Sequence, residues 1–198
     1  MDTSAATPST STREIQVDRA SGSKPRTVAR LQDWEYLERA LMRLIAGWGR
    51  HIAGLDDKVA VHRQLWEQAE CTRKLRDRLS QFPGSLHNLD QSVSAKLEQL
   101  ANTVLLAPSH QDAIDGIYQL LSRALTASYL HYIQHAHPIH DAPTVAVLHE
   151  VVGTKEQQRL WLREFRRRYP HATIPIANVA AMVFNCGCVG LREETIDA

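Results

Sequence analysis

Two charged residues lie at positions that the hydrophobic pattern assigns to the protein interior. Glu38 is one turn from Leu41 within a stripe of apolar residues at helical spacing. Lys155 is seven residues from Leu148 and seven from Leu162, so it should share their face of a helix. Because a lone buried charge is costly, we expect Glu38 and Lys155 to pair. Three interpretations follow: an ion pair that fixes helix register, a catalytic amine acting as acid, base or carbonyl-capturing nucleophile, or a lysine that reaches solvent at the rim.

Two histidines add imidazole groups to the same predicted interior. His62 falls on the expected inner face of its helix, and His135 falls within roughly 40° of Leu121 at the helical rotation per residue. A single histidine on an inner face is more often a hydrogen-bonded core residue than a catalyst, so both interpretations stay open. If the site is catalytic, we predict that its acid and base groups are Lys155, Glu38, His62 and His135.

Neutral polar and aromatic residues near these positions are the candidates for substrate binding. Gln68 borders the inner face of the second helix, and Tyr132 lies in the inner stripe of the third. The tryptophans should lie chiefly in the core, where they could also shape a flat apolar pocket. The predicted substrate-binding residues are Trp66, Gln68, Tyr132 and Gln158.

The remaining histidines and cysteines give weaker signals. His131 and His135 are one turn apart, but His137 and His140 lie at or past the break at Pro138, so a zinc or nickel site would need a particular loop shape. The three cysteines, Cys71, Cys186 and Cys188, do not imply a disulfide framework. We interpret Cys186 and Cys188 as buried or idle thiols.

The elements that must position these residues are amphipathic helices. A crossover of nearly thirty residues between Pro83 and Pro108, with its own short helix, separates the second main helix from the third. This layout predicts an all-α four-helix bundle with one long connection, the ferritin-like arrangement, followed by a C-terminal helical extension. Residues 1–28 should form a disordered leader, and residues 29–198 a single domain. The main helices are expected at 31–48, 55–82 and 109–137, with the fourth after Asp141.

Composition excludes several classes of function. The 198 residues contain 23 Lys and Arg against 22 Asp and Glu, so no bulk field attracts nucleic acid or an anionic membrane. The N-terminus lacks the apolar core of a secretory signal, and the longest apolar stretch, 174–189, is broken by polar residues and glycine. We therefore predict a cytoplasmic protein with no nucleic-acid or membrane partner, and we leave a homodimer as an open alternative.

Two segments resemble a group of bacterial ferritin-like proteins over residues 30–165. The first is VHRQLWEQAECTRKLRDRL from Val61, and the second is HDAPTVAVLHEVVGTKEQQRLW from His140. In the resembling family the second helix carries a Trp-Glu-Asp-Ala-x-His run and ends in Leu-Arg-x-Arg-Leu. The fourth helix opens with Asp-x-Pro-Thr-Val and proceeds to Asp-Glu-Glu-x-His. The resemblance implies the same bundle fold.

The chain departs from this family where the family binds metal. Its acid-x-x-His positions are occupied here by 68–71 (Gln, Ala, Glu, Cys) and 155–158 (Lys, Glu, Gln, Gln). A dimetal site needs carboxylates and imidazoles to balance about four positive charges, and a lysine adds charge of the wrong sign. We therefore expect no diiron or dimanganese centre and no cofactor.

Three functions remain compatible with the sequence. The first is a metal-independent ferritin-like protein whose vacated metal site is an apolar pocket for a small organic molecule, and any chemistry there would be cofactor-free isomerisation or cyclisation. The second is a non-catalytic bundle that serves as a subunit or scaffold. The third is a diiron oxidoreductase with an unusual ligand set: Glu38, Glu67, Glu70, His62, His149 and Glu156.

Overall fold

The computed structural model of the protein describes residues 24–86, 89 and 95–170, and within them the secondary structure is entirely helical. The predicted all-α class is confirmed for this part of the chain. The π-helical segment η1 continues α4 and is itself continued by α5. The elements are α1 (Lys24–Gly49), α2 (Leu55–Ser80), α3 (Ala95–Leu105), α4 (His110–Asp115), η1 (Gly116–Ser122), α5 (Arg123–His135) and α6 (Ala142–Arg168).

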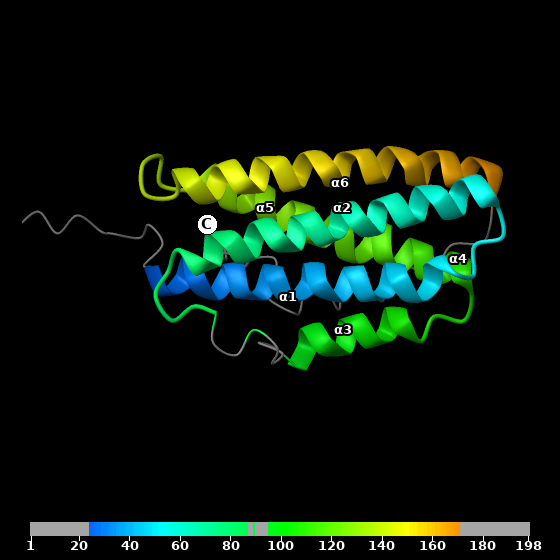
Figure 1. Ribbon diagram of the computed structural model, residues 1–198, viewed down its shortest axis with the longest axis horizontal. Coiled ribbons are helices and arrows are strands. Elements are labelled where there is room, and N and C mark those ends of the chain that lie inside the picture. Colours follow the sequence, from blue (N-terminus) through cyan, green and yellow to red (C-terminus); the bar gives the residue numbers. More distant parts are fainter. Residues whose placement is uncertain (1–23, 87–88, 90–94, 171–198) are drawn as a thin grey trace, which may run out of the picture.

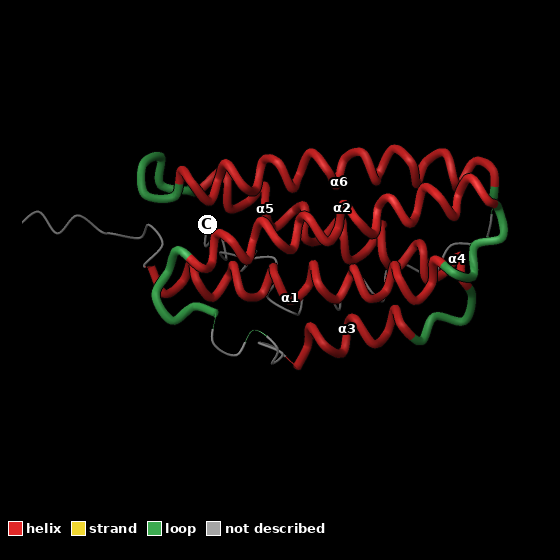
Figure 2. Tube along the Cα trace, viewed as in Figure 1, coloured by secondary structure: helices red, strands yellow, loops and turns green. Residues whose placement is uncertain are grey.

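The long helical segments lie side by side along the longest axis of the molecule (Figure 1). α1 packs against α2, α2 against α6, α6 against η1 and α5, and α4 and η1 against α1. α3 covers the outside of α1, α4 and η1. Figure 2 shows that the connections between α1 and α2 and between α5 and α6 are short and lie at opposite ends of the molecule.

The connection between α2 and α4 spans the length of the molecule. α2 ends at one end, α3 runs back along the outside, and the α4–η1–α5 segment then runs in the same direction as α2 (Figure 1). Gly84 lies in the turn that leaves α2 and has a positive φ of 73°, a conformation that glycine adopts without steric cost. The predicted crossover with its own helix is therefore present.

Polar residues at helix ends account for two of the boundaries. The Ser109 hydroxyl accepts a 3.1 Å hydrogen bond from the Asp112 backbone N–H, which caps α4. Asp141 precedes α6, as predicted, but its carboxylate accepts a 2.9 Å bond from the His137 backbone N–H and holds the preceding loop. Pro143 lies in the first turn of α6.

The interior is largely apolar, and an ion pair joins two helices at one end. Leu75 and Leu148 are completely buried. Arg168 pairs with the buried Asp57 at 2.6 Å, which joins the end of α6 to the start of α2. No helix in the described ranges is both long and apolar enough to cross a membrane.

Two predictions concern residues at the chain ends. α1 begins at Lys24, so residues 24–28, which we assigned to the leader, are helical. Residues 1–23, and the C-terminal extension expected after Tyr169 apart from Pro170, lie outside the described residues.

Candidate functional site

A buried ion pair lies at the centre of the helix assembly. Lys155 on α6 donates a 2.6 Å hydrogen bond from Nζ to Oε2 of Glu38 on α1. The side chains are 1% and 0% exposed, respectively. The prediction that these residues pair in the interior is confirmed. Both helices place their charge on a face whose neighbours are buried leucines, so neither group has water to replace its partner.

Gln68 on α2 and Tyr129 on α5 complete a polar network around the pair. Lys155 Nζ donates to Gln68 Oε1 at 2.7 Å, while the Gln68 amide donates to Glu38 Oε2 and to the Glu38 backbone carbonyl. The Tyr129 hydroxyl donates to Glu38 Oε1 at 2.7 Å. Both carboxylate oxygens therefore have protein donors, and the network joins four helices.

The network shifts the acidity of two neighbouring groups. Burial, together with the charge of Glu38 and the hydrogen bond to it, raises the pKa of Tyr129 well above its usual value. Tyr129 is thus held as a neutral donor. Burial first, and the Glu38 charge second, raise the pKa of the Cys71 thiol to about 11. Both shifts make ionisation of residues next to Glu38 unfavourable at neutral pH.

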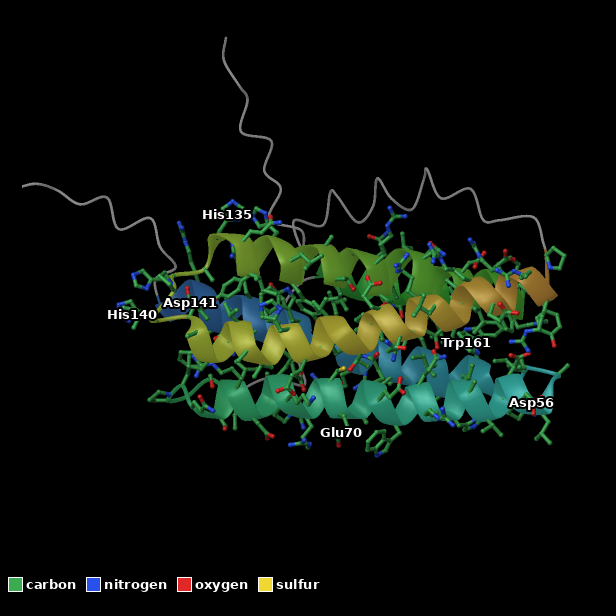
Figure 3. All side chains as sticks on the ribbon, turned by 90° about the horizontal axis from the view of Figure 1, so that it is seen from above. Asp56, Glu70, His135, His140, Asp141 and Trp161 are labelled. Carbon is green, nitrogen blue, oxygen red and sulfur yellow. The ribbon has the colours of Figure 1, made fainter. Side chains whose placement is uncertain are left out.

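A pocket of about 420 Å³ lies beside this network, and Lys155 is part of its wall. It is formed by the η1–α5 segment and α6, which lie alongside each other in Figure 3. Its size is in the usual range for small-molecule sites. The residues of η1 and α5 that line it are Tyr118, Gln119, Ser122, Arg123, Thr126, Ala127 and Leu130, and those of α6 are Lys155, Glu156, Arg159 and Arg163.

The π-helical segment contributes to the wall of this pocket. η1 spans Gly116–Ser122, and three of its residues, Tyr118, Gln119 and Ser122, line the pocket. A π-helical turn interrupts the regular α-helical ladder and changes which side chains face a neighbouring helix. Such turns frequently occur at functional sites, so this one is a second indication that the pocket is the site.

Three of the predicted site residues lie on the surface, and their expected inward placement is wrong. His62 is exposed and contacts the backbone carbonyl of Lys58 one turn earlier. Trp66 is 66% exposed. His135 is exposed at the end of α5, and Figure 3 shows it on the side of α5 that faces away from α6.

The other predicted substrate-binding residues are buried but separate from the pocket. Tyr132 packs edge-on against Trp34, with ring centroids 5.4 Å apart. Gln158 is 2% exposed and donates a 3.5 Å hydrogen bond to Glu67 on α2. Gln68 belongs to the Lys155 network. Only Lys155 among the predicted site residues lines the pocket.

The residues at the centre do not fit a dimetal site. Within the described residues, no three His, Cys, Asp or Glu side chains are grouped so that they could hold a metal ion. Glu38 is engaged by protein donors on both oxygens, and His62 and His149 are exposed. Glu70 and Glu156 pair with arginines on their own helices.

The predicted histidine cluster also fails to converge. His131 stacks on His135 with ring centroids 4.3 Å apart, and His137 stacks on His140 at 4.5 Å. The two pairs make separate contacts, and the described histidines form no group of three potential ligands. Cys186 and Cys188 lie outside the described residues.

Sequence reasoning missed Tyr129 and the arginines of the pocket. Tyr129 could have been found, because it lies four residues after Leu125 and eight after Leu121 and so shares their face. Arg159 and Arg163 follow Lys155 at four-residue intervals, which is a signal for one continuous row on α6. That signal alone does not distinguish a pocket wall from a solvated face.

None of the protein-family models, curated proteins and solved structures with which the chain was compared matches it.

Proposed function

We propose that the protein is a metal-independent, ferritin-like four-helix bundle that binds a small organic molecule in the pocket between η1–α5 and α6. The observation that carries this proposal is the position of Lys155. Its ammonium group is fixed in the core by Glu38 and Gln68, while the residue also forms part of the pocket wall. The buried network occupies the centre of the bundle, where the resembling family would hold metals, and it supports the floor of the binding site.

The course of the chain supports the ferritin-like part of the proposal. Between α2 and α4, the helix α3 runs back along part of the outside of the molecule (Figure 1). Ferritin-like bundles need one such long crossover because their second and third helices run in the same direction. The short connections on either side agree with this topology.

The geometry favours binding over cofactor-free acid–base chemistry at Glu38. A general base must reach the proton that it removes, and Glu38 is completely buried with both oxygens already bonded. Of the four predicted acid and base groups, Lys155 alone borders the pocket. Two of its three N–H groups are used by Glu38 and Gln68, and its side chain is only 1% exposed, so its ammonium group serves the buried network.

The character of the pocket differs from the apolar cavity that the sequence suggests. Arg123, Arg159 and Arg163 line it together with Ser122 and Thr126. Apolar surface comes from Ala127, Leu130 and the aliphatic part of Lys155. A ligand that suits this wall has both a polar and an apolar part.

A second candidate function is a non-catalytic subunit or scaffold. The observation that favours it is the outer face of α2, where Leu55, Val59 and Trp66 are 74%, 56% and 66% exposed. Exposed large apolar groups on one helix are typical of contact surfaces between proteins. A pure scaffold has no need of an open pocket beside Lys155, so we place this function second.

Filling the pocket should weaken ligand binding. Ala127 is exposed and lines the pocket, so Ala127→Trp places an indole in the opening without disturbing the core. With the fluorescent probe 8-anilinonaphthalene-1-sulfonate, we expect binding at least about tenfold weaker than in the wild type, which is about 1.4 kcal/mol. Fluorescence titration measures the change.

The matched control is Ala146→Trp, an exposed alanine on α6 that does not line the pocket. This variant should bind the probe as the wild type does, and both variants should retain the wild-type circular dichroism spectrum. Equal probe binding by all three proteins, or no binding by the wild type, would overturn the proposed site.

A further inference from the structure

Building on the proposed function, we propose that the pocket selects small organic anions, whose carboxylate or phosphate group is held between Arg123 on α5 and Arg163 on α6. The organic part of the ligand would lie against Ala127, Leu130 and the stem of Lys155. This assigns a ligand class and a polarity to the site.

The wall of the pocket carries an excess of positive charge. Four cationic side chains line it, and Glu156 is the one acidic residue among the lining residues. Lys155 is neutralised by Glu38 in the core, and Arg159 pairs with Glu156 at 2.7 Å. Neither Arg123 nor Arg163 has a carboxylate partner among the described residues. Two positive charges therefore border the pocket without a counter-charge.

The two arginines that lack a carboxylate partner among the described residues come from different helices of the pocket wall. Arg123 comes from the segment on one side of the pocket, and Arg163 comes from α6 on the other side. Lys155, Arg159 and Arg163 recur every four residues, so they form a row along the same face of α6. Guanidinium groups form paired hydrogen bonds with carboxylates and phosphates, which makes arginine the preferred residue for such anions.

Tyr118 lines the pocket, but its hydroxyl is buried away from solvent. Tyr118 is only 6% exposed, and its hydroxyl has no hydrogen-bond partner in the described part of the protein. Its ring packs against Trp161 with centroids 5.5 Å apart, and the Trp161 indole N–H also lacks a partner. A ligand in the pocket does not reach this buried hydroxyl, so the selectivity for anions comes from the two arginines.

Burial also keeps Tyr118 neutral. Burial, and secondarily the charge of Glu67, raise the pKa of its hydroxyl far above the usual range. The group therefore stays protonated and can donate a hydrogen bond.

Two dyes of almost the same shape test this inference. 8-Anilinonaphthalene-1-sulfonate carries a negative charge, and N-phenyl-1-naphthylamine lacks the sulfonate group. We expect the wild type to bind the anionic dye at least about tenfold more tightly than the neutral dye. In the variant Arg123→Gln/Arg163→Gln, the affinity for the anionic dye should fall by about tenfold or more, because two charge-assisted contacts are lost. The affinity for the neutral dye should stay the same.

The control variant is Arg43→Gln/Arg63→Gln. Both residues are exposed, lie outside the pocket and lack an ion-pair partner in the described ranges, so the net charge changes by the same amount. This variant should retain the wild-type affinity for the anionic dye. An equal loss in both double variants would mean that long-range charge, and not the pocket arginines, attracts the dye, and would overturn the inference.

Competition extends the test to carboxylates and phosphates. Benzoate and phenyl phosphate should displace the anionic dye, whereas benzyl alcohol at the same concentration should not. Displacement by either anion supports the inference and identifies the preferred head group. If both dyes bind equally well, are lost in Ala127→Trp and are insensitive to the arginine change, the pocket binds small molecules without charge selection. That result would reject the anion inference and leave the proposed function intact.

Discussion

Replacing Lys155 alone by Met should lower the free energy of unfolding by about 3–5 kcal/mol. The methionine side chain keeps most of the length and apolar surface of the lysine but deletes the ammonium group. The completely buried Glu38 carboxylate would then have only the neutral donors Gln68 and Tyr129. An uncompensated buried charge is costly in a low-dielectric interior. Urea denaturation followed by circular dichroism measures the loss.

Changing both partners should recover most of this stability. In Glu38→Gln/Lys155→Met no buried charge remains, so we expect an unfolding free energy within about 1 kcal/mol of the wild type. Lys74→Met is the matched control, because Lys74 on α2 pairs with Glu150 on α6 at 2.6 Å at the surface. Its effect should be far smaller than that of Lys155→Met. Equal effects of the two single changes would mean that the central pair is solvated.

The thiol of Cys71 should react with iodoacetamide about a hundredfold more slowly than an ordinary cysteine at pH 8. Its pKa is raised from 9.0 to about 11, mainly by burial and further by the Glu38 charge. At a pH below both pKa values, a pKa that is two units higher lowers the fraction of reactive thiolate about a hundredfold. Mass spectrometry of the peptide that contains Cys71 gives the rate separately from the other cysteines.

The dependence of the labelling rate on pH shows whether the pKa of Cys71 is raised or lowered. In the folded protein the Cys71 labelling rate should still rise steeply between pH 8 and 10, because the thiol is mostly protonated over that range. In urea the rate should level off near the ordinary pKa of a thiol. Labelling of the folded protein as fast as the unfolded one would show that Cys71 is not held in a dry environment next to Glu38.

The central pair was predictable because its two helices have well-defined apolar stripes. Leu41 on α1, and Leu148 and Leu162 on α6, fix the phase of each helix, and the charged residue follows from that phase. Electrostatics then requires a buried carboxylate to find a cation. Pattern and physical cost pointed to the same pair.

The inner face of α2 was harder to predict, because its core positions are polar. Gln64 and Gln68 are 4% and 0% exposed, and they do not contribute to an apolar stripe. The prediction therefore centred the inner face of α2 on the apolar residues Leu65 and Ala69, whereas the buried face contains Gln64 and Gln68. This error in helix phase placed His62 and Trp66 in the predicted interior, although both are exposed in the structure.

The pocket could not be predicted from periodicity. It depends on a π-helical turn at Gly116–Ser122, which changes the rotation per residue along the third main helix. Its polar wall consists of arginines, whose spacing is equally typical of a solvated helix face. The distinction rests on which helices lie next to each other, and this information appears only in the folded arrangement.

The central claim, that this pocket is the functional site and that it needs no metal, is tested most directly by nuclear magnetic resonance. Uniformly ¹⁵N-labelled protein, kept in EDTA, is titrated with 8-anilinonaphthalene-1-sulfonate while its amide signals are followed. We predict saturable shifts in 118–130 and 155–163, with little change on the outer face of α2 around Trp66. Shifts confined to α2, or shifts at the pocket that appear only after iron or manganese is added, would contradict the account.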